Sequence, residues 1–336
     1  MNVWKLLEAK KLMKSEVPLP EKQEGLIRVR VTKVLFNNQD ADIISGATRV
    51  KYPIIPGRFA VGHIAEENTN PVFPKGTRVL LHGYRPVPQE GTEKRDFSGD
   101  DYFACGKTTD GYLRDFVLVS PNDMTALPPS VSDERGLILH HIAAAKEITD
   151  KIDAQKGQHI IVVGADLIGI LVCQLLIYQQ SAPILVDTDK ARLDFARECG
   201  VYYAYSANDN IIDTVASVTG GRLAAGAVYI STASGNLAEL PLSLCARGGR
   251  VVYFSTSASK LVVDLDLAFR KHLSVDCVSH GLKHLETAIH LVANKAVDIT
   301  AFNANSVKSD KVGELIASYL AHPDRNPNEI NYIDLL

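Results

Sequence analysis

The sequence has few cysteines, and no two of them lie close together. Five occur in 336 residues, and no C-x-x-C pair is found among them. A disulfide framework or a zinc knuckle would need closely spaced pairs. We therefore expect reduced, buried thiols at all five positions (Cys105, Cys173, Cys199, Cys245 and Cys277).

A surplus of positive charge is also missing. Lys and Arg number 36 against 39 Asp and Glu, the formal net charge is −3, and the basic residues are spread along the whole chain. A nucleic-acid backbone requires a basic stripe or patch. Nucleic acid is therefore not an expected partner, and we expect a small-molecule substrate.

Secretion and membrane signals are absent as well. The N-terminus lacks the charged start, apolar core and small-residue cleavage site of a signal peptide, so we expect a cytoplasmic protein. One apolar run, His159 to Tyr178, resembles a membrane span, but Gly164, Asp166 and Gly169 interrupt it. We interpret the run as a strand, a tight turn and a buried helix, and we expect no membrane contact.

The first part of the chain has the pattern of a β domain. Apolar and polar residues alternate from Gly25 to Leu35, and short apolar runs follow at 78–81 and 116–119 among Pro and Gly. This predicts a barrel-like β domain over roughly the first 125 residues. The polar stretch Tyr84–Asp101 is expected to be an exposed loop. Ser132 can cap a helix that leads into the next domain.

The second part alternates strand-like and helical segments, which is the pattern of an α/β protein with a doubly wound parallel sheet. Two amphipathic helices are expected near the C-terminus, at 285–294 and 311–321, followed by a short strand at 332–334. The expected sheet strands are 159–164, 184–187, 227–232, 250–255 and 273–278, with a helix at 190–199.

A dinucleotide-binding fingerprint follows the first of these strands. Gly164 and Gly169 are the outer glycines of a G-x-G-x-x-G turn, which aims helix N–H groups at a pyrophosphate. Asp187 ends the next strand 23 residues after Gly164. An acid there accepts hydrogen bonds from the ribose 2′-OH and repels a 2′-phosphate, which favours NAD(H) over NADP(H).

The fingerprint departs from its pattern at Asp166, which replaces the middle glycine. That glycine normally lets the backbone approach the phosphates, so a carboxylate there should weaken cofactor binding. The alternative is a domain that keeps its fold and binds no nucleotide. Asp187 counts against this alternative, because the acid has no evident packing purpose at a strand end.

Several further motifs occur in the order of one known family. They are Pro53-Ile54-Ile55-Pro56-Gly57 with Val61-Gly62, Phe103-x-x-Gly106 with Asp110-Gly111-Tyr112, and Arg247-Gly248-Gly249-Arg250. With them the chain resembles the medium-chain dehydrogenase/reductase family, close to its sorbitol and threonine dehydrogenase branch, over nearly its whole length.

The resemblance implies two domains and an oligomer. Residues 1–130 and 285–336 would form a GroES-like β-barrel catalytic domain, and residues 131–284 a Rossmann domain, with the active site in the cleft between them. A homodimer or homotetramer is implied. The implied cofactor contacts are Gly164, Asp166, Leu167, Ile168, Gly169, Asp187, Arg192, Thr232 and Ser255.

The resemblance fails at the metal ligands. Zinc members carry C-G-S-D where this chain has Asn37 to Asp40, and G-H-E where it has Gly57-Arg58-Phe59. The third ligand position matches His140. The four closely spaced cysteines of the structural zinc lobe are missing from 84–101. Because a catalytic zinc needs three protein ligands, zinc is not expected at either place.

Another group must then polarise the substrate. Arg58 is the best candidate, since its permanent charge could stabilise an alkoxide-like transition state or hold a carboxylate or phosphate of the substrate. Asp40 could orient Arg58 by a paired hydrogen bond, with Asn37 beside it, and His140 or His141 could transfer the proton.

The function expected is a zinc-independent, NAD(H)-dependent oxidoreductase acting on an alcohol or carbonyl, such as a polyol or an anionic sugar derivative. Two alternatives stay open. One is an NADPH-dependent quinone or enoyl reductase, which Asp187 disfavours. The other is a catalytically silent nucleotide-binding homologue, which would explain both Asp166 and the missing ligands.

Overall fold

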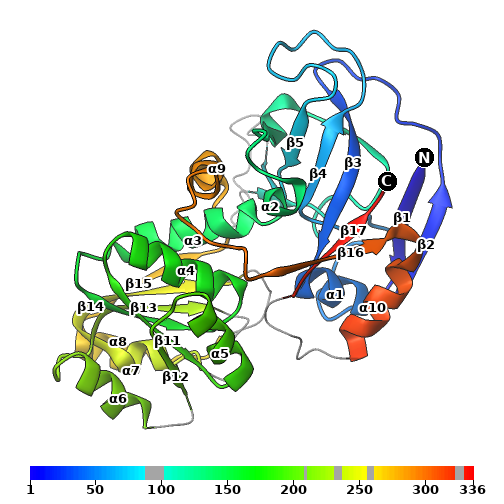
Figure 1. Cartoon of the computed structure of the whole chain (residues 1–336). Coiled ribbons are helices and arrows are strands. Elements are labelled where there is room, and N and C mark those ends of the chain that lie inside the picture. The colour runs from blue at the N-terminus through cyan, green and yellow to red at the C-terminus, as the bar shows by residue number, and fades with distance from the viewer. Residues whose placement is uncertain (88–101, 208–209, 231–236, 256–260, 322–328) are drawn as a thin grey trace, which may run out of the picture. The chain divides into compact units, whose positions relative to one another are not determined.

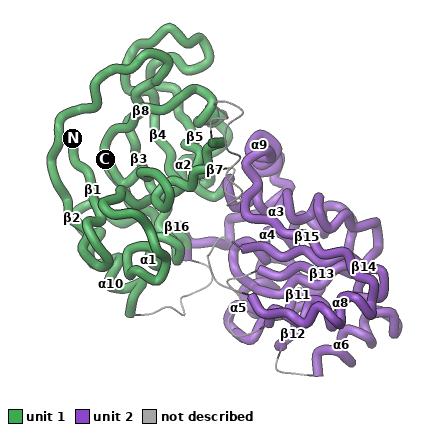
Figure 2. The backbone as a smooth tube through the Cα atoms, turned by 180° about the vertical axis from the view of Figure 1, so that it is seen from behind, with its two compact units in different colours: residues 1–138, 304–324, 330–336 green, residues 139–303, 325–329 purple. Residues whose placement is uncertain are grey.

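The chain folds into two compact units (Figure 2). The computed structural model describes residues 1–87, 102–207, 210–230, 237–255, 261–321 and 329–336. Unit 1 comprises residues 1–138, 304–324 and 330–336, and unit 2 comprises residues 139–303 and 325–329. The sequence had indicated boundaries near 130 and 285. They differ from those in the structure because the helix at 285–293 packs on the helix at 139–152, within unit 2.

Unit 1 is built on a seven-stranded sheet with the path β16-β17-β3-β4-β5-β9, in which β8 also pairs with β3 (Figure 1). Two hairpins, β1-β2 and β6-β7, complete its strands. The strands are β1 (Asn2–Glu8), β2 (Lys11–Glu16), β3 (Ile27–Phe36), β4 (Ala60–Ile64), β5 (Arg78–Leu81), β6 (Tyr84–Pro86), β7 (Tyr102–Ala104), β8 (Phe116–Val119), β9 (Met124–Ala126), β16 (Asn303–Lys308) and β17 (Glu329–Asp334). The helices are α1 (Asn38–Ser45), η1 (Pro121–Asp123), α2 (Asp133–Gly136), η3 (Ser309–Lys311) and α10 (Val312–Ala321).

The alternation in β3 explains why this sheet forms. Ile27, Val29 and Val31 are buried in the core of unit 1, while Arg28 and Arg30 between them are only half-buried. Such a period-2 pattern lets one face of an antiparallel strand pack and the other meet solvent. The prediction of a β domain is confirmed.

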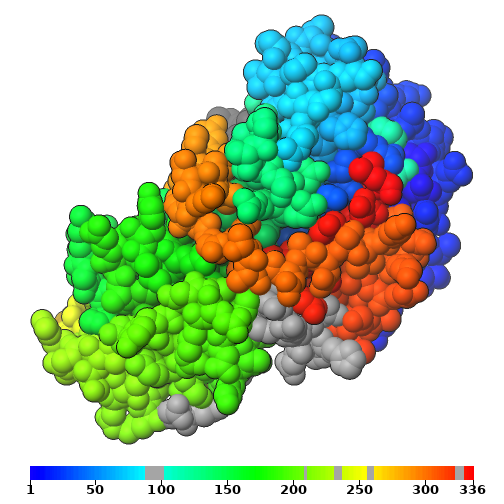
Figure 3. Space-filling view, in the orientation of Figure 1, coloured from blue at the N-terminus to red at the C-terminus, as the bar shows by residue number. Residues whose placement is uncertain are grey.

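The C-terminal segments of the chain return to unit 1. β17 pairs with β3 in antiparallel register, and α10 packs on α1. Figure 3 shows these orange and red segments at the surface beside the blue N-terminal strands. The predicted helix at 311–321 and strand at 332–334 are both confirmed.

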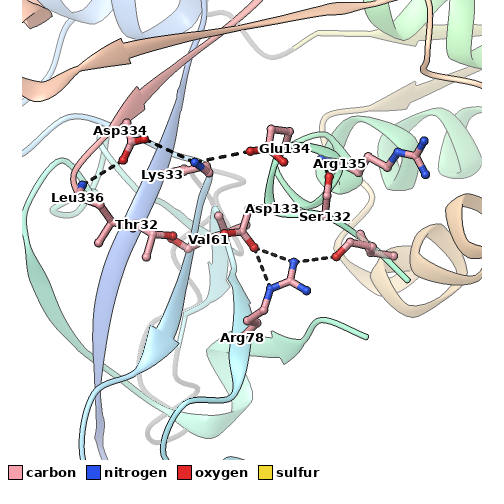
Figure 4. A network of polar contacts seen from close by, with 11 residues as sticks. Thr32, Lys33, Val61, Arg78, Ser132, Asp133, Glu134, Arg135, Asp334 and Leu336 are labelled. Atoms are coloured by element: carbon pink, nitrogen blue, oxygen red, sulfur yellow. Dashed lines mark hydrogen bonds and ion pairs between the residues drawn. The ribbon is translucent and has the colours of Figure 1, made fainter. Parts of the chain in front are cut away.

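A polar network connects α2 and the C-terminal strand β17 with β3 and β5 (Figure 4). Lys33 Nζ lies 3.5 Å from Glu134 and 3.6 Å from Asp334. Arg78 donates to Asp133 at 2.7 Å and to the carbonyl oxygen of residue 131 at 2.7 Å. Lys33 and Arg78 therefore each meet at least one carboxylate.

Unit 2 is a six-stranded, wholly parallel sheet of order β12-β11-β10-β13-β14-β15. Figure 1 shows this sheet between a layer that contains α3 and α4 and a layer that contains α6, α7 and α8. Its strands are β10 (His159–Val163), β11 (Ala182–Asp187), β12 (Tyr203–Ser206), β13 (Ala224–Ile230), β14 (Cys245–Phe254) and β15 (Ser274–Val278). Its helices are α3 (Leu139–Ile152), α4 (Leu167–Tyr178), α5 (Lys190–Glu198), α6 (Ile211–Val218), α7 (Leu240–Leu244), α8 (Leu265–Lys271), η2 (Leu282–His284) and α9 (Leu285–Ala293).

The doubly wound prediction for unit 2 is confirmed, because every predicted strand occurs in one parallel sheet. β10 is buried from Ile160 to Val163, as expected for a central strand covered on both faces. The sequence reading missed β12, a short edge strand rich in tyrosine. Within the described residues, no helix has the length and apolar character needed to cross a membrane.

Candidate active site

The turn between β10 and α4 has the backbone geometry of a nucleotide-binding loop. Gly164 has a φ of +114°, a conformation that residues with a side chain rarely adopt. A Cβ on Gly169 would lie 1.8 Å from the carbonyl oxygen of Gly164. Both positions therefore require glycine, and the N–H groups at the start of α4 face the turn.

Asp166 is the N-cap of α4. Its Oδ1 accepts a hydrogen bond of 2.9 Å from the backbone N–H of Gly169. The carboxylate thus satisfies one of the helix N–H groups that a pyrophosphate would use. This explains how an acid is accommodated at the middle position of the motif.

Asp187 holds the same turn from the end of β11. Its side chain is fully buried, and its carboxylate accepts from the N–H of Ala165 at 2.7 Å and from the N–H of Asp189 at 2.9 Å. The expectation that this acid has no packing purpose is wrong, because it ties the glycine turn to the start of α5. A structural role alone would be enough to keep an acid here.

The other predicted cofactor residues surround this turn or lie on neighbouring loops. Leu167 and Ile168 form the first turn of α4. Arg192 is on α5, where its Nε lies 3.9 Å from Asp189, and its buried Nη1 has no hydrogen-bond partner among the described residues. Ser255 follows β14 and donates its backbone N–H to the carbonyl oxygen of residue 278. Thr232 lies outside the described residues.

In unit 1, Asn37 and Asp40 build the start of α1. The Asn37 side chain accepts from the N–H groups of Gln39 and Asp40, and Asp40 accepts from the N–H of Asn37 at 3.2 Å, which completes a capping box. Asn37 therefore serves helix capping.

Arg58 is buried next to this helix, with only 4% of its surface exposed. Its Nε donates to the carbonyl oxygen of Cys105 at 3.3 Å, and its Nη1 donates to Gln39 Oε1 and, at 3.3 Å, to the Tyr84 hydroxyl. The guanidinium also lies over the Tyr84 ring, 5.4 Å from its centroid. The sequence reading missed Gln39 and Tyr84 as partners of Arg58, and expected Tyr84–Pro86, which is β6, to be loop.

The expected paired hydrogen bond between Asp40 and Arg58 is not formed. The described contacts of Arg58 include no ion pair, and Asp40 is held by backbone N–H groups. Burial raises the pKa of Asp40 to about 6, although the charge of Arg58 and the backbone amides oppose that rise. Asp40 acts on the Arg58 guanidinium through space, since its carboxylate accepts from the backbone N–H groups of Asn37, Gly57 and Arg58.

Two family models match the chain. The alcohol dehydrogenase GroES-like domain matches residues 23–129, and the zinc-binding dehydrogenase domain matches residues 168–294. Together they fall on the β domain and on the parallel-sheet domain described above. The chain is a medium-chain dehydrogenase/reductase of the alcohol dehydrogenase type. This dehydrogenase is therefore an oxidoreductase.

Relatives of the dehydrogenase are distant in sequence. An uncharacterized zinc-type alcohol dehydrogenase-like protein of Haemophilus influenzae is 22% identical over 92% of both chains. A D-xylulose reductase A of Aspergillus niger is 26% identical over 61% of this chain and 59% of its own. A solved short chain alcohol dehydrogenase of E. coli, complexed with NADH, has a TM-score of 0.84 at 18% identity and covers 100% of this chain and 99% of its own.

The residues of the dehydrogenase do not fit the zinc that its family model names. Asn37 caps α1, Arg58 carries a positive charge, and Phe59 is a buried aromatic residue. Within the described ranges, no three His, Cys, Asp or Glu side chains are grouped as a metal ion would require. We therefore derive no step through a metal.

The two predicted proton-transfer residues lie at the start of α3. His140 is buried and His141 half-buried. Both belong to unit 2, whereas Arg58 and Asp40 belong to unit 1. Proton transfer by His140 or His141 stays a prediction.

Proposed function

We propose that the dehydrogenase transfers hydride between NAD(H) and an alcohol or carbonyl substrate without zinc. The observation that carries the proposal is a buried Arg58, at a position where the family resemblance places a zinc ligand, in a chain that has the glycine turn of a nucleotide site. A buried guanidinium can supply the positive charge that zinc would otherwise supply.

The glycine turn supports a dinucleotide as cofactor. Gly164 and Gly169 would let the pyrophosphate approach the start of α4, and Asp187 would face the ribose near the end of β11. A negative charge at Asp187 disfavours a 2′-phosphate, which supports NAD(H) over NADP(H). When bound, the nicotinamide supplies or accepts the hydride.

Arg58 would stabilise negative charge on the substrate oxygen or hold an anionic group, and His140 or His141 would exchange the proton with that oxygen. Family resemblance further supports a homodimer or homotetramer acting on a small molecule, and we propose a cytoplasmic location. Light scattering that gave a monomer mass of 36.6 kDa at micromolar concentration would contradict the oligomer.

Cofactor binding tests the proposal before any substrate is known. Titrating the protein with NADH and with NADPH, followed by ligand fluorescence, should give tighter binding of NADH. Elemental analysis of the same sample should give far less than one zinc per chain. Stoichiometric zinc, or preference for NADPH, would contradict the proposal, and NADPH preference would favour a quinone or enoyl reductase.

The second candidate function is a catalytically silent nucleotide-binding protein. Asp166 favours it, because its carboxylate already occupies the Gly169 N–H that a pyrophosphate would use. NADH binding without turnover of any alcohol or carbonyl in a broad panel would support this candidate.

A further inference from the structure

Arg58 carries a buried charge that no carboxylate pairs with directly. The hydrogen bonds of its guanidinium to described residues go to neutral acceptors, namely a backbone carbonyl oxygen, the Gln39 amide oxygen and the Tyr84 hydroxyl, while its backbone N–H donates to the Asp40 carboxylate. Burying an ion away from water is costly unless an opposite charge meets it. Within the described residues, the Tyr84 ring and, through space, the Asp40 carboxylate offset only part of this cost.

One edge of the guanidinium is left available. Nε and Nη1 account for every hydrogen bond that the Arg58 side chain makes with described residues, and Nη2 makes none. Some side-chain nitrogens of the described residues are fully buried and lack a hydrogen-bond partner, but Arg58 Nη2 is not one of them. Part of its surface is therefore accessible to solvent. The other contacts fix the plane of the guanidinium, so the direction of the Nη2 donors is set in advance.

Asp40 does not act as the missing counter-ion. Its carboxylate accepts from the backbone N–H groups of Asn37, Gly57 and Arg58 and forms no ion pair with the Arg58 guanidinium. Burial raises the pKa of Asp40 to about 6, although the charge of Arg58 opposes that rise. The attraction between the two groups is therefore weaker than the cost of burying Asp40.

Two half-buried arginines of unit 1 are paired with carboxylates, whereas Arg85 and Arg114, also half-buried, form no ion pair among the described residues. Arg28 donates to Glu66 at 2.9 Å, and Arg78 donates to Asp133 at 2.7 Å. The side chains of both arginines are more exposed than Arg58 as a whole. The most deeply buried of these three cations is the one that lacks a carboxylate.

We propose that Arg58 is the receptor for an oxyanion that the substrate carries in its ground state, a carboxylate or a phosphate. This rests on the proposed function and narrows its substrate class to anionic alcohols or carbonyls, such as a polyol phosphate or a hydroxy acid. A planar guanidinium with a fixed free edge matches both groups. Gln39 and Tyr84 are positioning residues that hold this edge in place.

Direct binding tests the proposal without any turnover. Isothermal titration of the whole protein with a hexitol phosphate, a 2-hydroxy acid and the neutral hexitol should give heat with at least one anion and none with the neutral compound. Loss of a charge-assisted hydrogen bond should weaken anion binding about 10- to 100-fold in Arg58→Gln. Arg58→Lys keeps the positive charge but loses the planar pair of donors, so its anion affinity should lie between those of wild type and Arg58→Gln.

A matched control and an independent readout complete the test. Arg78→Gln removes a paired arginine of the same unit and should leave anion binding unchanged, and NADH titration of each variant reports on folding and on the cofactor site. Equal anion affinity in wild type and Arg58→Gln, no binding of either anion, or equal binding of the neutral hexitol would each overturn the proposal. If anion binding depends on Arg58 but the protein does not bind NADH, the role of Arg58 as an anion receptor is supported and the proposed function is refuted.

Discussion

Two sets of basic residues in unit 1 differ in what surrounds them. Lys33 and Arg78 lie in a network in which each meets a carboxylate (Figure 4), and they connect β3 with β17 and both β3 and β5 with α2. Arg58 is more deeply buried and meets only neutral acceptors. Paired charges can be explained by folding alone, whereas burying a cation without a paired carboxylate is costly. We therefore interpret Lys33 and Arg78 as residues that stabilise the fold and Arg58 as part of a candidate site.

Removing Arg58 should have the largest effect on function. If the guanidinium holds a ground-state anion, Arg58→Ala should raise KM with kcat nearly unchanged. If it stabilises the transition state, kcat should fall by on the order of 10²-fold or more. In both cases folding and NADH binding should persist. Steady-state kinetics with an anionic substrate decides, and full activity in Arg58→Ala would return the residue to a structural role.

Breaking the paired network should lower stability and leave binding intact. Lys33→Met removes contacts to Glu134 and Asp334, so the free energy of unfolding should fall by roughly 1 kcal/mol. Burial lowers the pKa of Lys33, but Asp334 and its neighbours raise it above the ordinary 10.5. The stabilisation is therefore complete below about pH 10 and is lost as the pH rises through the folded-state pKa. Urea unfolding at pH 7 and above pH 11 measures both effects, and a deficit in Lys33→Met that stays the same at both pH values would contradict this account.

Asp166 is a carboxylate at the glycine turn between β10 and α4, where its charge should affect cofactor binding. Asp166→Asn keeps an acceptor for the Gly169 N–H but removes the negative charge, so NADH should bind several-fold more tightly. Asp166→Gly should also tighten binding, at the cost of the helix cap. NADH fluorescence titration measures the change, and unchanged affinity in both variants would mean that the pyrophosphate does not approach this side chain.

A small pH effect should reveal how Asp40 acts on Arg58. Asp40, with a pKa of about 6, is charged at pH 7.5 and repels an anion bound at Arg58. Its protonation removes this repulsion, so sulfate, which does not titrate in this range, should bind a few-fold more tightly at pH 5 than at pH 7.5. Asp40→Asn should flatten the dependence. Equal sulfate affinity at the two pH values in wild type would contradict this coupling.

The fold could be predicted further than the site because its signals are local. The alternation in β3 and the glycine turn after β10 each fix an element within a few residues, and the structure confirms both. The short edge strand β12 gave no such signal. The place of the 285–293 helix depends on its packing against α3, which no pattern along the chain records.

The site could be predicted only in part, because its partners come together from separate segments. The sequence singled out Arg58 and Asp40, but Gln39 and Tyr84 join Arg58 through the tertiary fold. It also treated Asp187 as an acid without a structural purpose, since the hydrogen bond to the Ala165 N–H depends on how the turn closes on β11. The loss of the zinc ligands stays a prediction from residue identity, whereas three-dimensional packing was needed to find what surrounds Arg58.

The most direct test of the central claim is the rate of NAD-dependent oxidation of an anionic polyol before and after removal of metal by a chelator, with the zinc content of each sample measured. The account predicts equal rates in samples that hold far less than one zinc per chain. A rate that falls on chelation and returns when zinc is added would contradict it.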